Sequence, residues 1–145
     1  MASDGPGIGL LCFVVGRAME TRVMAAIQEA GYDDITLAQS RAFARVGADG
    51  TRVTDLAEQA RITKQTAVFL VNQLEQAGYV ERVVDPADAR ARLVRLAPRG
   101  RRLQQVARRV ERQLEREWAT HLGARDAAAL HRILTDLREV TDPYA

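Results

Sequence analysis

The side chains of this sequence that are best suited to binding chemistry are amides, hydroxyls and arginines between residues 64 and 92. Gln65 and Asn72 carry amides, and an amide can pair bidentately with the edge of an adenine base. Arg90 and Arg92 carry guanidinium groups, which suit phosphates and the negative potential of a narrow A·T-rich minor groove. These residue types predict contacts to nucleic acid and supply no obvious nucleophile.

The spacing of apolar residues separates a buried helix face from an outward one. Positions Ala67, Leu70, Val71 and Leu74 recur three or four residues apart. The outward positions and the following hairpin give the predicted DNA-binding residues, which are Lys64, Gln65, Thr66, Val68, Phe69, Asn72, Gln73, Asp88, Arg90 and Arg92. Val68 can touch a thymine methyl, and Phe69 can do the same or pack against its own subunit. An ordinary solvated face is the alternative.

Two short helices and a hairpin are expected to position these residues. We expect Thr54 to cap a helix ending at Ala60, residues 61–62 to turn, and Thr63 to cap a second helix that Gly78 ends. Two β-branched runs follow, at 79–84 and 92–96, with residues 85–91 as the tip of a hairpin. Helix, turn, helix and hairpin in this order predict a winged helix, which lays its second helix in the DNA major groove.

The flanking sequence predicts four further helices, so the expected fold class is mainly α with a small β-hairpin wing. These helices are expected over residues 10–30, 36–46, 98–121 and 126–142. Thr36 and Gln39 form a capping box, Pro98 suits a first helical turn, and Asp126 can cap the last helix after the break at Gly123. Residues 1–9 are expected to have no regular structure.

Composition and charge narrow the class of protein. The chain has 145 residues, of which 47% are hydrophobic and 28% charged, and it has no apolar run long enough to span a bilayer. One cysteine and no basic secretory signal favour a cytoplasmic protein. Residues 80–112 contain ten arginines and only four acidic residues, so an excess of positive charge falls on the wing and the next helix. No motif for a phosphate loop, a metalloprotease or a hydrolase is present, so we expect no enzyme and no cofactor.

Two stretches carry a resemblance to a known family. LEQAGYVER, residues 74–82, and DPADARARLVRL, residues 85–96, resemble the winged-helix core of the MarR family of bacterial transcription regulators. In that family's D-x-R pattern, matched by Asp88 and Arg90, the acid steadies the hairpin and the arginine enters the minor groove. Arg92 is then expected on a phosphate. A surface ion pair worth about 0 to 1 kcal/mol is the alternative for the pair.

The resemblance implies an organisation and a function. Residues 1–145 form one MarR-like domain, with a winged helix-turn-helix lobe at 36–97 and dimerisation helices at 10–30 and 98–141. The implied function is a sequence-specific regulator, a repressor, that binds a pseudo-palindromic operator on double-stranded DNA as a homodimer and is released by a small aromatic or lipophilic effector. A winged helix for protein contacts or nonspecific nucleic-acid binding is the alternative. The chain departs from the family at Phe69, where a basic residue is common, and at Ala97, where threonine is usual.

The implied effector cleft lies between the dimer helices and the lobe, and the residues that could line it are Arg17, Arg41, Phe43 and Trp118. Each could equally belong to the core or the surface.

Cys12 resembles the reactive cysteine of the family's peroxide-sensing branch, which would make the protein a redox-sensing repressor. The supporting tyrosine one turn later is replaced by Gly16, and no basic residue lies within a turn. We therefore favour a small buried hydrophobe at this position. Cys12, His121 and His131 are spaced too far apart in sequence to indicate a metal site.

Overall fold

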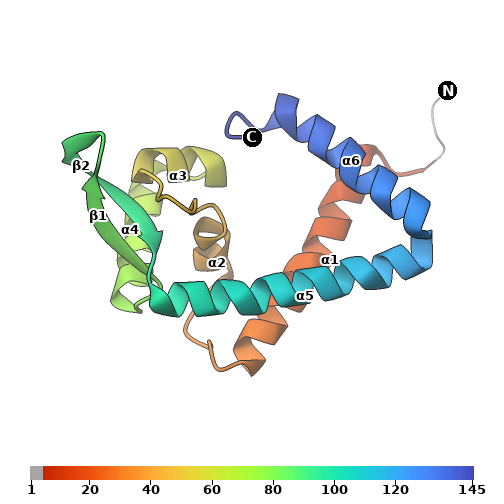
Figure 1. Cartoon of the computed structure of the whole chain (residues 1–145), viewed down its shortest axis with the longest axis horizontal. Helices are drawn as coiled ribbons and strands as arrows, with labels where there is room; N and C mark the ends of the chain where they lie inside the picture. The colour runs from red at the N-terminus through yellow and green to blue at the C-terminus, as the bar shows by residue number, and fades with distance from the viewer. Residues whose placement is uncertain (1–4) are drawn as a thin grey trace.

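The computed structural model describes residues 5–145, and this part of the chain forms six helices and one two-stranded sheet (Figure 1). The elements are α1 (Ile8–Glu29), α2 (Leu37–Phe43), α3 (Val53–Ala60), α4 (Lys64–Gln76), β1 (Val80–Asp85), β2 (Asp88–Leu96), α5 (Pro98–Leu122) and α6 (Ala124–Thr141). The predicted fold class, mainly α with a hairpin wing, is therefore confirmed. Residues 1–4 of the segment expected to have no regular structure lie outside the described part, and α1 begins two residues earlier than expected.

Helices α3 and α4 form the helix-turn-helix. Arg61 turns the chain between them with a left-handed φ of 55°, which is unusual for a residue other than glycine. The hydroxyl of Thr63 accepts a hydrogen bond from the backbone N–H of Thr66 at 3.1 Å, so the predicted cap of α4 is confirmed. The four positions predicted to face inward from α4 are all buried.

The core of this lobe lies between α3, α4, the hairpin and the start of α5. Leu56, Val71, Tyr79 and Val94 are each 0% exposed within it. Gly100 lets α5 approach the hairpin closely, because a Cβ at this position would lie 2.0 Å from the carbonyl oxygen of Tyr79. The wing and the first turn of α5 are therefore fixed to one another.

The hairpin is longer and its tip shorter than the sequence suggested. Strand pairing runs from Val80 opposite Leu96 to Asp85 opposite Asp88, so residues 88–91 belong to β2 and were wrongly assigned to the tip. A two-stranded ribbon that is exposed on both faces accepts polar residues and alanine, and this stretch therefore shows no apolar alternation. Thr51 adds an isolated antiparallel bridge to Val94 at the base of the wing.

Three helix ends differ from prediction. Thr54 does not cap α3, because the bridge at Thr51 holds the chain extended and the helix starts at Val53 with Arg52 as its N-cap. Asp126 does not cap α6 but lies in its first turn, after Gly123. The capping box of Thr36 and Gln39 is present, but α2 ends at Phe43, after which residues 44–46 continue as a tighter turn.

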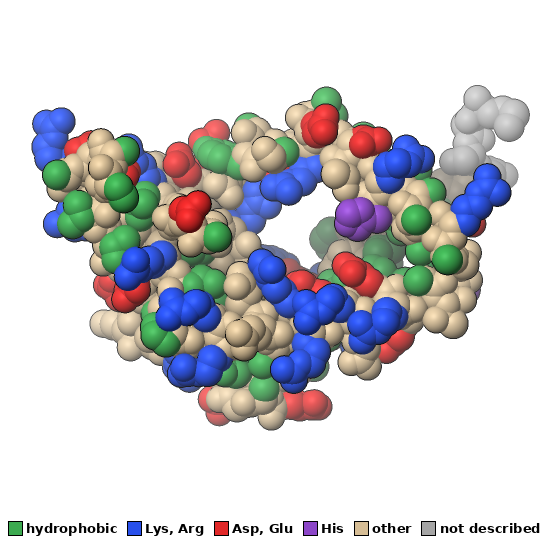
Figure 2. Space-filling view, viewed as in Figure 1, with side chains coloured by type: hydrophobic (Ala, Val, Ile, Leu, Met, Phe, Trp, Pro, Cys, Tyr) green, Lys and Arg blue, Asp and Glu red, His purple; other side chains and the backbone are tan. Residues whose placement is uncertain are grey.

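The terminal helices extend away from the lobe. Helix α1 packs on α5 and α6 folds back from the far end of α5, so that the three helices and the lobe surround an opening that is visible in Figure 2. The C-terminal end returns to the lobe, where Asp142 accepts a hydrogen bond from Arg45 at 3.1 Å and the Tyr144 hydroxyl donates to Glu58 at 2.6 Å. None of the helices in residues 5–145 has the length and apolarity needed to cross a membrane.

Most apolar side chains of the terminal helices are exposed in the single chain. Helix α6 has no buried residue, and α1 has only Ile27. The exposed apolar residues are Ile8, Leu10, Leu11, Phe13, Val14, Val15, Leu130, Ile133, Leu134, Leu137 and Val140.

Candidate nucleic-acid interface

The outward face of α4 presents nearly all of its predicted contact residues to solvent. Lys64, Gln65, Thr66, Val68, Phe69 and Asn72 are exposed, and Gln73 is half-buried. Phe69 has an exposed fraction of 60%, so it does not pack into its own subunit. Gln65 lies in the first turn of the helix, which is the part of a recognition helix that reaches base edges.

Two of the amides on this face are already hydrogen bonded inside the chain. Arg82 of β1 donates from Nη2 to Asn72 Oδ1 at 2.7 Å and from Nη1 to Glu75 Oε1 at 2.7 Å. Gln39 of α2 donates from Nε2 to Gln73 Oε1 at 2.9 Å. Neither partner was predicted from the sequence, because separations of 10 and 34 residues leave no periodic pattern.

At the wing, Arg90 projects into solvent with a side chain that is 95% exposed. Asp88 accepts a hydrogen bond from the backbone N–H of Arg90 at 3.0 Å, and its carboxylate lies 3.6 Å from the Arg90 guanidinium. Arg92 donates to the carbonyl oxygens of Ala89 and Ala91 at 3.4 and 3.3 Å. Arg90 is thus open to a partner, whereas Arg92 is held against the backbone of the hairpin.

A buried acid at the tip of the hairpin, where β1 ends, ties the wing to the helix-turn-helix. Asp85 is 7% exposed and accepts hydrogen bonds from the Ala87 backbone N–H at 2.9 Å and from Arg52 Nη2 at 2.8 Å. These bonds hold the pKa of the Asp85 carboxyl below its usual value, the Ala87 bond first and the Arg52 bond second. Arg52 is the N-cap residue of α3, so the pair joins the wing to the helix-turn-helix.

A second cluster joins the end of α4 to α5 and to the loop after α1. Arg99 donates to Asp34 at 2.8 Å and to the carbonyl of Ala77 at 2.6 Å, and its guanidinium lies 4.3 Å from the centre of the Tyr79 ring. The Tyr79 hydroxyl donates to Asp34. The Arg99 hydrogen bond, followed by that of Tyr79, lowers the pKa of Asp34, and burial is the main cause that raises the pKa of Tyr79. The cluster therefore ties the C-terminal end of α4 to the first turn of α5 and to the loop after α1.

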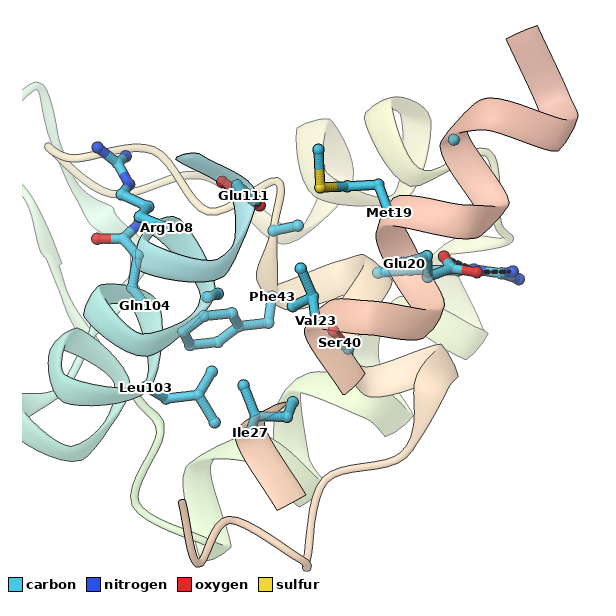
Figure 3. Close-up of a pocket in the computed structure, with 14 residues that line it drawn as sticks. Met19, Glu20, Val23, Ile27, Ser40, Phe43, Leu103, Gln104, Arg108 and Glu111 are labelled. Atoms are coloured by element: carbon cyan, nitrogen blue, oxygen red, sulfur yellow. Dashed lines mark hydrogen bonds and ion pairs between the residues drawn. The ribbon is translucent and has the colours of Figure 1, made fainter. Parts of the chain in front are cut away.

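A cleft of about 350 Å³ separates α1 from α5 above α2 (Figure 3). Val23, Ile27, Phe43 and Leu103 give it an apolar floor, and Arg108 stands at the wall formed by α5. Of the residues proposed for an effector site, Arg41 and Phe43 line this cleft, whereas Arg17 and Trp118 are outside its lining.

Glu20 of α1 binds two arginines, Arg41 of α2 and Arg17 of α1. Arg41 binds the Glu20 carboxylate through two hydrogen bonds, at 2.8 and 2.9 Å, and Arg17 adds one at 3.1 Å. The hydrogen bond from Arg41 is the largest cause of a lowered pKa at Glu20. In Figure 3 the Glu20 side chain points away from the cleft, toward this ion pair.

Cys12 is exposed in this chain, contrary to our expectation of a buried position, because α1 extends past α5 at this end and no other element covers it. It borders a shallow hollow together with Phe13, Arg17 and Arg41. Within residues 5–145, no cluster of His, Cys, Asp and Glu side chains could hold a metal ion.

The lobe matches a known family in sequence, and the whole chain matches solved structures in fold. Residues 33–91 match the model of the MarR family. The fold is shared with CouR from Rhodococcus jostii bound to p-coumaroyl-CoA, at 22% identity and a TM-score of 0.73 over 99% of each chain. It is also shared with apo MarR from E. coli, at 23% identity and a TM-score of 0.71 over 92% of this chain and 98% of the other.

A MepR mutant from S. aureus bound to an oligodeoxyribonucleotide has 19% identity and a TM-score of 0.58 over 95% of this chain and 100% of the other. No curated protein matches the chain in sequence. The family match covers the helix-turn-helix and most of the wing, and the shared fold includes the terminal helices. The lobe therefore matches the MarR family in sequence, and the chain as a whole has the winged helix-turn-helix fold of the solved CouR and MarR structures.

Proposed function

We propose that this protein is a sequence-specific DNA-binding transcriptional regulator that acts as a homodimer in the cytoplasm. The observation that carries the proposal is the outward face of α4, where exposed amide, hydroxyl and apolar side chains lie beside a wing with a 95% exposed Arg90. A purely electrostatic binder would carry mainly Lys or Arg on that helix face, because phosphates are bound by positive charge and bases by groups matched to their edges. Lys64 is the one basic residue among the predicted contacts of α4.

The exposed apolar faces of α1 and α6 support the homodimer. A set of leucine, valine, isoleucine and phenylalanine side chains of this size is rarely left in water on a soluble monomer, and a second copy of the chain offers the same faces. Two symmetric lobes would then meet a pseudo-palindromic operator with half-sites about one helical turn, roughly 10 bp, apart. We infer that the dimerisation helices are 10–30 and 98–141 and the DNA-binding lobe is 36–97.

The test of this function begins with selection of bound DNA from a random pool by the full-length protein. We expect enrichment of one pseudo-palindromic sequence, and a gel shift in which unlabelled random competitor does not displace it at two salt concentrations. Binding that random competitor removes fully would favour a nonspecific nucleic-acid binder. The absence of any shift on any duplex would favour a winged helix that serves protein contacts.

We propose further that the protein is a repressor released by a small aromatic or lipophilic effector in the cleft between α1 and α5. An apolar floor with arginines at the rim suits a flat apolar molecule that carries an acidic group. A molecule bound in this cleft would change the angle between α1 and the lobe. In the proposed homodimer, that change would alter the distance between the two copies of α4.

The effector proposal can be tested with the fluorescent aromatic probe 8-anilinonaphthalene-1-sulfonate. Gln104→Phe fills the cleft, and Gln105→Phe places the same side chain on the exposed neighbouring position outside it. We expect the wild type and Gln105→Phe to bind the probe and to bind the operator more weakly in its presence. We expect Gln104→Phe not to bind the probe. Equal binding to all three proteins would remove this cleft as the effector site, and a reporter gene activated by the protein would exclude the repressor role.

A further inference from the structure

The three amides on the outward face of α4 differ in what they can offer to DNA. Gln65, Asn72 and Gln73 all belong to residue types that can pair bidentately with adenine, through one donor and one acceptor. Bidentate pairing requires that the carbonyl oxygen and the NH₂ group of the amide both point at the same base, so a hydrogen bond inside the chain that directs the oxygen elsewhere removes one of the two contacts. The hydrogen bonds inside the chain decide which of the three meet this condition.

The orientation of the Asn72 amide follows from its partner. Arg82 has only donors, so the Asn72 atom 2.7 Å from its Nη2 must be the oxygen. Arg82 is itself held in place, because its Nη1 donates to Glu75 Oε1 at 2.7 Å and its backbone N–H donates to Glu75 Oε2 at 3.2 Å. The bond to Arg82 thus directs the Asn72 oxygen toward β1, which leaves the NH₂ group as the part of this amide that can turn to a base.

The orientation of Gln73 follows through one more step. The backbone N–H of Thr36 donates to Gln39 Oε1 at 3.0 Å, and a backbone N–H cannot accept, so Gln39 must present its NH₂ group to Gln73. That NH₂ group donates to Gln73 Oε1 at 2.9 Å. Because Gln39 is buried and belongs to the capping box of α2, Gln73 is tied to the scaffold.

Gln65 differs from both. In the described chain no hydrogen bond engages its amide, it is exposed, and it lies in the first turn of α4. Asn72 follows seven residues later and so shares its face of the helix, roughly 10 Å further along.

We propose that Gln65 is the one bidentate adenine reader of each lobe, and that Arg82 restricts Asn72 to donating a hydrogen bond. This inference rests on the proposed sequence-specific function. A lone NH₂ group can donate to N7 of either purine, to O6 of guanine or to O4 of thymine, so Asn72 should not separate adenine from guanine. Gln73 should contribute to the placement of α4 and to no base preference. Arg82 is then a positioning residue for specificity, although it reads no base itself.

The test measures affinity of the full-length protein for every single-base variant of the operator that the wild type selects. For the wild type we expect one adenine in each half-site preferred over guanine by about 5-fold to 150-fold, and this preference is lost in Gln65→Ala. Asn72→Ala should weaken binding at a second position equally for adenine and guanine there. Gln73→Ala should leave every base preference unchanged.

The discriminating variant is Arg82→Met, which frees the Asn72 oxygen. We expect it to create an adenine preference of about 10-fold at the Asn72 position, because the amide can then turn and pair bidentately. The matched control is Arg95→Met on the neighbouring strand, where Arg95 is paired with Glu81 at 2.7 Å and loses the same charge. The control should weaken binding without a new preference, and the double variant Arg82→Met with Asn72→Ala should lose the gained preference.

The outcomes separate this inference from the proposed function. Failure to select any sequence would overturn the proposed function, and the inference with it. A selected operator with two adenines per half-site, one of which depends on Asn72 in the wild type, would overturn the inference alone. Identical base profiles for Arg82→Met and Arg95→Met would do the same. If Arg82→Met does not fold, Asn72→Ala still tests the inference, because it should lower the affinity equally for operators with adenine and with guanine at the Asn72 position.

Discussion

Leu56 in α3 and Leu134 in α6 both belong to amphipathic helices, yet Leu56 is 0% exposed and Leu134 is 45% exposed. The contrast holds for the regions around them. The lobe of α2, α3, α4 and the hairpin covers its own apolar faces, whereas α1 and α6 leave theirs in solvent. The core of the lobe is therefore accounted for within one chain, whereas the exposed apolar faces of the terminal helices support the proposed homodimer.

The difference also separates two kinds of ion pair. In the lobe, Arg52 and Asp85 fix the wing with an acid that is 7% exposed. Outside the lobe, Arg22 and Glu117 join α1 to α5, and both side chains are 47% exposed. An exposed ion pair contributes about 0 to 1 kcal/mol, so this pair adds little to the stability of the α1–α5 packing.

The largest effect that would test this comparison is expected at Leu56. Leu56→Ala should lower the free energy of unfolding by about 2 to 5 kcal/mol, because it leaves a cavity in a closed core. The matched control is Thr54→Ala on the exposed side of the same helix, which should change stability by less than about 0.5 kcal/mol because Thr54 is not a cap. Chemical denaturation measures both, and a cost of about 1 kcal/mol at Thr54 would restore its predicted capping role.

The same substitution at Leu134 should act through the dimer. Leu134→Ala should cost about 2 kcal/mol per subunit and make the melting temperature depend more steeply on protein concentration, because the lost burial is between chains. Sedimentation at micromolar concentration should show twice the 16.0 kDa chain mass for the wild type and a shift toward monomer for the variant. A folded wild-type monomer would defeat the proposal, and Thr135→Ala on the same helix is the control.

The contrast explains which parts of the fold could be predicted from the sequence. Local rules located the capping box at Thr36, the cap at Thr63 and the buried face of α4, since each depends on residues three or four positions apart. They failed at Thr54, because the bridge of Thr51 to Val94 holds the chain extended up to Arg52.

The candidate site divides in the same way. The outward face of α4 and the exposed wing arginine are local patterns, and the structure leaves them at the surface. The bonds of Arg52 to Asp85 and of Gln39 to Gln73 join residues 33 and 34 positions apart, so no spacing rule could indicate them. The exposure of Cys12 likewise depends on where α1 extends past α5.

Within the lobe, substitutions in α4 and in the wing should weaken DNA binding in different ways. Gln65→Ala should cost about 1 to 3 kcal/mol at one base pair per half-site and leave the salt dependence nearly unchanged. Arg90→Ala should weaken binding to most duplexes, change the log-log salt slope by about one, and blunt the preference for A·T-rich flanks. Affinities for single-base operator variants at two salt concentrations separate the two. Uniform weakening with a flatter salt slope for Gln65→Ala would make Gln65 a phosphate contact.

A smaller effect should follow from protonation of Asp85 at the tip of the hairpin. The pKa of Asp85 is lower in the folded chain than in the unfolded one, so its contribution to stability is complete above the unfolded pKa, near 4, and is lost as the pH falls through the folded value. Asp85→Asn should therefore be less stable than the wild type at pH 7, and the difference should shrink below about pH 4. Denaturation at several pH values measures this, and a constant difference would contradict it.

The smallest effect is expected at Cys12, although it is exposed. A reactive thiol needs a positive neighbour that stabilises the thiolate, and the guanidinium groups that share its hollow, those of Arg17 and Arg41, are both bound to Glu20. Cys12→Ser should change operator affinity by less than about 2-fold, which is about 0.4 kcal/mol, with or without organic hydroperoxide. The measurement is a gel shift of wild type and variant before and after peroxide, with a thiol reductant added back. Release of the wild type but not the variant would make Cys12 a sensor, and would mean that a pairing partner or the second subunit supplies the activation that one chain does not.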